Sequence, residues 1–90
     1  MTENSEDSPL KFPCEFPIKI MGRDEEALHI EISEIFTRHA PDTKAENIKR
    51  RLSKKKNYVS VTVTINATSR EQLDNIYREL TASKYTLFVL

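Results

Sequence analysis

Glu26 and His29 have the Glu-x-x-His spacing that lets a carboxylate and an imidazole meet one metal ion from a single helix face. Dinuclear carboxylate sites need a second such pair and further glutamates from facing helices. The second predicted helix carries Glu71 and Glu79 but no histidine. We therefore interpret Glu26 and His29 as part of a solvated helix face, and predict neither a metal site nor a cofactor.

The other reactive residues do not form a catalytic set. Cys14 is the single cysteine, lies in a proline-flanked segment and has no nearby histidine pattern to activate its thiol. His39 ends the first predicted helix without a serine, cysteine or carboxylate beside it in sequence, so we expect it to pack or to interact with the helix dipole. The single glycine, Gly22, excludes a glycine-rich phosphate loop. We predict that the protein is not an enzyme.

Nucleic-acid binding is the alternative that the sequence leaves open. Residues 56–63 align with the third-strand pattern of RNA-recognition motifs and keep its basic residue, Tyr58 and one valine. Ser60 and Val63 stand where the other aromatics belong, which removes most of the base-stacking platform. The alternative function is therefore weak binding of single strands through Tyr58 and three lysines, Lys54, Lys55 and Lys56.

The segment from Lys56 to Arg70, which contains Tyr58 and Ser60, has the pattern of a strand. Five apolar residues alternate there with four polar ones, a period of two that is typical of a strand with one covered face. The apolar residues are Val59, Val61, Val63, Ile65 and Ala67, and the polar ones are Ser60, Thr62, Thr64 and Asn66. We predict a central strand with helices on its valine face and an open hydroxyl face.

The remaining elements follow from hydrophobic periodicity. Residues 16–21 alternate as a first strand, residues 25–39 carry a helical apolar stripe, and residues 46–53 form a less regular second strand. A second helix follows residue 69, and residues 85–90 close the chain as an apolar strand. With right-handed crossovers, the order βαββαβ predicts an α+β, ferredoxin-like fold, with a four-stranded antiparallel sheet and two helices on one face.

Local signals predict where the helices begin. Asp24 is the predicted N-cap of the first helix, and Ser69 with Gln72 fits a capping box for the second, with Thr68 and Glu71 as the competing register. Gly22 lies where the first strand turns into the helix. We attribute it to a backbone conformation that other residues disfavour, with close approach to a ligand as the functional alternative.

Composition predicts one domain. The chain has 90 residues, and we divide it into a disordered acidic tail at 1–11 and a domain at 12–90. No apolar run approaches the ~20 residues of a membrane span, and the first residues lack a signal-peptide core. We therefore expect a cytoplasmic protein that does not bind membranes.

The zero net charge hides a basic segment. Residues 44–56 hold seven basic side chains and one acidic one. Such a run attracts anions or acidic partners, or it is a solvated hairpin whose lysines discourage edge-to-edge pairing.

Several segments together resemble the YbeD-like family of small bacterial proteins, a domain of unknown function. They are Phe16-Pro17, Ile20-Met21-Gly22, Arg38-His39-Ala40-Pro41, Asn57-Tyr58, the run from Ser60 to Thr68, Glu71-Gln72-Leu73 and Val89-Leu90. The family commonly has a glycine where Lys56 stands here. The resemblance implies a ferredoxin-like fold similar to amino-acid-binding regulatory (ACT) domains, with ligands near the loop Gly22-Arg23-Asp24. It implies no established activity or catalytic residue.

We therefore predict a non-enzymatic, ACT-like regulatory or interaction module, present as a monomer or a weak homodimer. It would bind a small metabolite or a protein partner through the open sheet face and the loop after the first strand. The candidate ligand-binding residues are Lys19, Gly22, Arg23, Lys49, Arg51, Ser60, Thr62 and Thr64.

Overall fold

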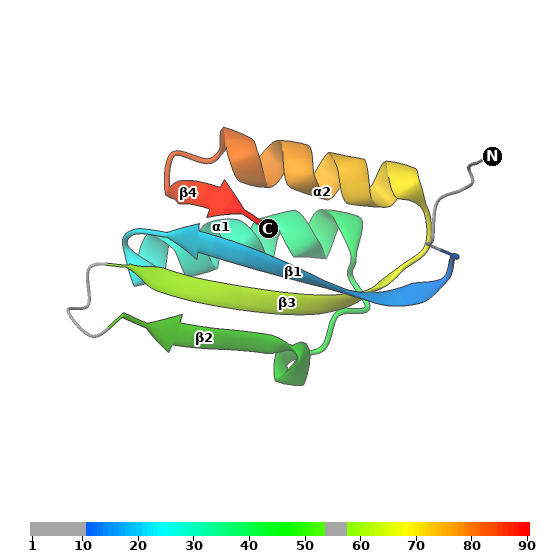
Figure 1. Cartoon of the computed structure of the whole chain (residues 1–90), viewed down its shortest axis with the longest axis horizontal. Helices are drawn as coiled ribbons and strands as arrows, with labels where there is room; N and C mark the ends of the chain where they lie inside the picture. The colour runs from blue at the N-terminus through cyan, green and yellow to red at the C-terminus, as the bar shows by residue number, and fades with distance from the viewer. Residues whose placement is uncertain (1–10, 54–57) are drawn as a thin grey trace.

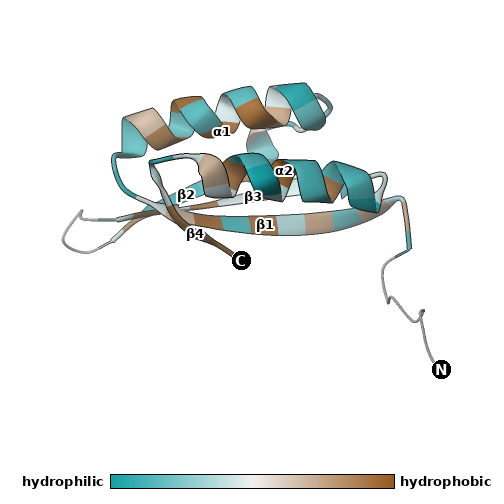
Figure 2. Ribbon diagram, turned by 90° about the horizontal axis from the view of Figure 1, so that it is seen from above, coloured by the Kyte–Doolittle hydropathy of each residue, from teal (hydrophilic) through white to brown (hydrophobic). Residues whose placement is uncertain are grey.

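The computed structural model describes residues 11–53 and 58–90 and contains the predicted succession of elements (Figure 1). Both helices lie on one side of the sheet, and its other side carries no helix (Figure 2). The elements are β1 (Cys14–Gly22), α1 (Glu25–His39), a 3-10 turn η1 (Ala45–Asn47), β2 (Ile48–Leu52), β3 (Val59–Ala67), α2 (Arg70–Ala82) and β4 (Thr86–Val89).

The sheet has the strand order β2-β3-β1-β4, and all its neighbouring strands are antiparallel. β1 and β3 are therefore central, as the ferredoxin-like prediction requires. Their pairing runs without a break from Cys14 opposite Ala67 to Gly22 opposite Val59. β2 and β4 are the edge strands, and the pairing of β4 shifts register between Met21 and Gly22.

The core lies between the sheet and the two helices. Every second residue of β3 from Val59 to Ala67 is buried, as the period of two predicts. α1 adds Leu28, Ile32, Ile35 and Phe36, and α2 adds Leu73, Ile76 and Leu80. The uninterrupted apolar face of β3 explains why the helices pack on this side and leave the hydroxyl side open.

Both helix starts use the predicted capping residues. The Asp24 carboxylate accepts a hydrogen bond from the Ala27 amide at 3.1 Å, and Asp24 itself has a left-handed backbone with φ of 57°. The Ser69 hydroxyl accepts from the Gln72 amide at 3.0 Å, which selects the Ser69 register. The Gln72 side chain turns back to accept from the Thr68 amide at 2.7 Å.

The predicted reason for Gly22 is wrong. Its φ is not positive, so no special backbone conformation requires glycine here. Instead, a Cβ at this position would lie 2.7 Å from Leu28 Cδ2 and closer still to the carbonyl oxygen of Tyr85. Close packing of α1 and of the β4 entry against the end of β1 therefore excludes a side chain.

Three strands differ in extent from the predicted ones. β1 is longer and spans 14–22, residues 45–47 form the η1 turn so that β2 spans 48–52, and β4 spans 86–89. Residues 1–10 of the predicted tail at 1–11 and the three lysines at 54–56 lie outside the described residues. No helix in the described part of the chain is long and apolar enough to cross a membrane.

Candidate functional site

The open face of the sheet consists of the outward-pointing residues of β1, β2 and β3. Lys19 lies opposite Thr62, which lies opposite Lys49, so the two lysines flank a threonine across three strands. One step along the strands, Met21 and Arg51 flank Ser60 in the same way. The register thus brings together Lys19, Lys49, Arg51, Ser60 and Thr62, with Thr64 at the next step.

The cations of this face have no acidic partner among the described residues, whose ion pairs lie elsewhere. Arg50, which points to the helix side, instead pairs with Glu25 of α1 at 3.2 Å. Lys19, Lys49 and Arg51 are all exposed. Their positive charge is therefore available to an anion that approaches the open face.

A hollow of about 330 Å³ lies beside Thr64 and Asn66, toward one end of this face. Two further shallow hollows adjoin each other and share Lys19, Arg51 and Ser60. One, of about 360 Å³, is lined by charged and hydroxyl side chains and also includes Lys49 and Thr62. The other, of about 230 Å³, has an apolar portion made by Met21 and Tyr58, with Leu52 and Ser53 at its β2 end. Because the hollows adjoin, one ligand can occupy both.

Gly22 and Arg23 do not belong to this group. Gly22 is buried on the helix side of the sheet, opposite Val59. Arg23 is exposed in the loop before α1, where its amide donates to the Tyr85 carbonyl at 3.1 Å. The structure therefore separates the two parts of the predicted site. Among the nucleic-acid residues, Tyr58 lies at the rim of the smaller hollow, while Lys54, Lys55 and Lys56 are outside the described residues.

A charged cluster between the helices was missed by sequence reasoning. Glu79 of α2 accepts a hydrogen bond from Arg38 and pairs with His39, both at the end of α1. The hydrogen bond from Arg38, followed by that from His39, lowers the pKa of the Glu79 carboxyl below its ordinary value. His39 thus has a carboxylate partner, but one from a distant segment of the chain, which sequence spacing could not reveal.

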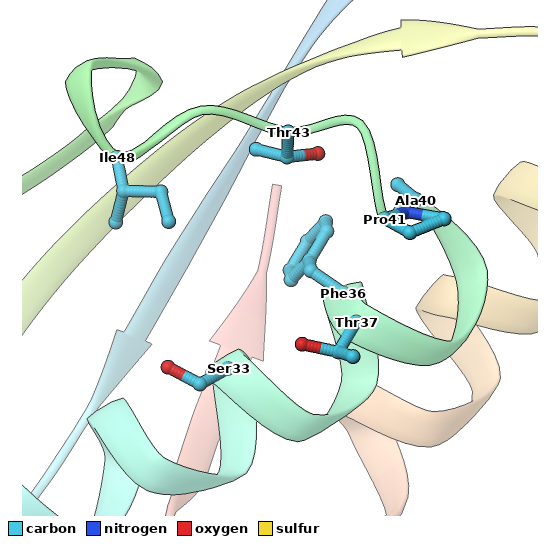
Figure 3. A pocket seen from close by; sticks show the side chains of 7 residues that line it. All are labelled: Ser33, Phe36, Thr37, Ala40, Pro41, Thr43 and Ile48. Atoms are coloured by element: carbon cyan, nitrogen blue, oxygen red, sulfur yellow. The ribbon is translucent and has the colours of Figure 1, made fainter.

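On the helix side, an open hollow of about 450 Å³ lies on the surface of α1, lined by Ser33, Glu34, Thr37 and Arg38. A hollow of about 110 Å³ lies between α1 and the loop to β2, with Phe36, Thr43 and Ile48 turned toward it (Figure 3). This volume is well below the ~300 Å³ of small ligand sites. Within residues 11–53 and 58–90, no three His, Cys, Asp or Glu residues are grouped to hold a metal ion, and Glu26 and His29 gain no further ligand.

The fold and its open face define a ferredoxin-like α+β protein. Its backbone is similar to the solution structure of protein HP0495 from H. pylori, with a TM-score of 0.73 over 96% of this chain and 90% of that one. The two sequences are 12% identical, so this likeness concerns the fold alone.

The chain belongs to the family described as "Protein of unknown function (DUF493)", whose model matches residues 7–90. It is 43% identical to a UPF0250 protein of Neisseria meningitidis serogroup C over 91 residues, all of both chains. A Janthinobacterium relative of the same description is 40% identical over 93% of this chain and 92% of its own. These matches confirm the family predicted from the sequence segments.

Proposed function

We propose that the protein is a non-enzymatic binding module of regulatory type, whose open sheet face takes an anionic group. The single observation that supports this most is the convergence of Lys19, Lys49 and Arg51 around the hydroxyls of Ser60 and Thr62, without an acidic partner in the described part of the chain. The anion would be a phosphate or carboxylate of a small metabolite, or an acidic side chain of a protein partner.

Strand spacing supports a common target for the two lysines. Neighbouring strands lie ~4.8 Å apart, so Lys19 and Lys49, with β3 between them, have backbones about 10 Å apart. Flexible lysine side chains from both directions reach an anion above Thr62. Arg51, two residues along β2 from Lys49, adds a planar group with fixed donors that suit phosphate or carboxylate.

The hydroxyl row, made of Ser60, Thr62 and Thr64, can bind oxygen atoms of a ligand by uncharged hydrogen bonds. Ser60, Thr62 and Thr64 each supply a donor that rotates to suit a bound oxygen. Arg23 remains a peripheral contact in this proposal, for a ligand large enough to reach the loop. Gly22 acts only by keeping that loop close to β4.

The test is an NMR titration of the full chain with sodium phosphate at constant ionic strength. We expect amide shift changes to concentrate at residues 19, 49–51 and 60–62. Arg51→Gln should weaken phosphate binding about tenfold, because a charge-assisted hydrogen bond contributes ~1.5–3 kcal/mol.

Arg70→Gln is the matched control, since Arg70 is an exposed arginine at the start of α2. It should leave phosphate binding unchanged. Equal weakening by both substitutions, or shift changes spread over the whole surface, would mean that the face holds no specific anion site.

Weak binding of single-stranded nucleic acid is the second candidate function. It is favoured by Tyr58, which lies beside Arg51 at the smaller hollow. Ser60 and Thr62 occupy the central positions of the face where a strand-binding sheet places aromatics, so this candidate ranks below the small-anion proposal.

A further inference from the structure

The smaller hollow differs in chemistry from the anion site that it adjoins. Met21 and Tyr58 contribute apolar surface to it, whereas hydroxyl and charged groups line the larger one. Arg51 lines both and can offer a planar surface for stacking. An anion bound at Lys19 and Lys49 would therefore have an apolar recess directly next to it.

In the described part of the chain, Tyr58 is not among the side chains that form the hydrophobic core or pack against it. The other two tyrosines, Tyr77 and Tyr85, pack against the core, and the Tyr77 hydroxyl donates to the Leu90 carbonyl at 3.2 Å. The Tyr58 side chain is 44% exposed. Its backbone is nevertheless held, because its carbonyl accepts from the Ser53 amide at 2.9 Å and its amide donates to the Ser53 hydroxyl at 3.2 Å.

We propose that the ligand of the open face is a mononucleotide, that is, a phosphate joined to a planar ring. This inference depends on the proposed anion site. The phosphate lies over Thr62 between Lys19 and Lys49, and the ring lies in the smaller hollow against Tyr58. That hollow, of about 230 Å³, suits one ring system, since a buried cavity of about 150 Å³ binds benzene.

The same chemistry could come from one nucleotide of a single strand, but the face favours the free ligand. Proteins that bind strands stack two or three successive bases on aromatic residues. Phe88 lies beyond Met21 on β4, and neither Ser60 nor Thr62 offers a ring in between. Among the described aromatic residues, Tyr58 is the one that lines a hollow together with Lys19 and Arg51.

The test measures the affinity of the full chain for four probes by NMR titration at constant ionic strength. They are AMP, UMP, inorganic phosphate and adenosine. We expect at least one nucleotide to bind roughly tenfold or more tightly than phosphate and adenosine, because stacking on Tyr58 adds to the anion contacts. Tyr58→Leu should reduce nucleotide affinity to that of phosphate and leave phosphate binding unchanged.

Phe88→Leu is the matched control, since Phe88 is an exposed aromatic on the same face but outside both hollows. It should not alter nucleotide binding. Because Tyr58 and Phe88 are both exposed, an unchanged amide spectrum away from the substitution will show that each variant folds.

Other results would overturn the inference in distinguishable ways. If phosphate binds and neither nucleotide binds more tightly, the result supports the anion site and contradicts the ring site. If neither phosphate nor any nucleotide binds, both proposals fall. If a short oligoadenylate binds far more tightly than AMP, with a steep salt dependence, the ligand is a strand and not a free nucleotide.

Discussion

At the residue scale, the absence of a Cβ atom at Gly22 allows β1, α1 and the segment before β4 to pack closely together. It ends β1, and the space a side chain would need is taken by the Tyr85 carbonyl oxygen and by Leu28 of α1. The Tyr85 carbonyl cannot move away freely, because it also accepts the hydrogen bond from the Arg23 amide. The packing of α1 and β4 against β1 therefore depends on the absence of a Cβ.

Gly22→Ala should destabilise the protein by ~1–3 kcal/mol, the usual cost of overpacking a close-packed site. Urea unfolding followed by circular dichroism measures this as a lower midpoint. The sign of the change in stability distinguishes the two cases. At a position with free space, Gly→Ala usually stabilises by ~0.4–1 kcal/mol, because it reduces the conformational entropy of the unfolded chain. A gain in stability would show that the contact with Tyr85 relaxes easily.

At the scale of elements, the first turn of α2 is joined to β3 and α1 by side-chain hydrogen bonds. The Ser69 hydroxyl caps the Gln72 amide, and the Gln72 side chain accepts from Thr68 and donates to the His39 carbonyl at 2.8 Å. One glutamine thus joins the start of α2, the end of β3 and the end of α1.

Ser69→Ala should lower the free energy of unfolding by about 1 kcal/mol, because the Gln72 amide loses its capping acceptor. Ser33→Ala is the control within a helix, since Ser33 lies mid-helix in α1 and alanine is the better helix former. Urea unfolding of both variants makes the comparison. Equal effects would indicate that the Ser69 cap contributes nothing specific.

At the scale of the whole molecule, Glu79 links the two helices above the sheet. Its carboxylate interacts with Arg38 and His39 of α1, and these hydrogen bonds lower its pKa. A group with a lowered pKa in the folded state stabilises the protein above its unfolded-state pKa, and this stabilisation is lost as the pH falls through the folded-state value. The link should therefore weaken in acid.

Glu79→Gln should make the protein less sensitive to acid. Between about pH 6 and about pH 3, the urea midpoint of the natural protein should fall more than that of the variant, because only the natural protein must protonate Glu79. Glu46→Gln is the control, since Glu46 is exposed in the η1 turn without an ion pair among the described residues. Parallel pH profiles for the natural protein and Glu79→Gln would contradict this role.

Much of the candidate site was predictable, because side-chain direction in a strand alternates residue by residue. The alternation of Val61 and Val63 with Ser60, Thr62 and Thr64 predicted both the buried face and the open one. The hydroxyl row on the solvent side needed no knowledge of which strands are neighbours. The start of β2 was not predictable, because the mixed residues before Ile48 show no pattern that separates the η1 turn from a strand.

The sequence by itself determined the order of the elements, the core residues and the hydroxyl face, since these depend on local periodicity and capping. Only the tertiary structure decided which side chains meet. It placed Lys19 and Lys49 on either side of Thr62, brought Glu79 to Arg38, and filled the space beside Gly22 with the Tyr85 carbonyl. These contacts join segments far apart in the chain, so they depend on strand order and helix packing. Local sequence patterns therefore do not predict them.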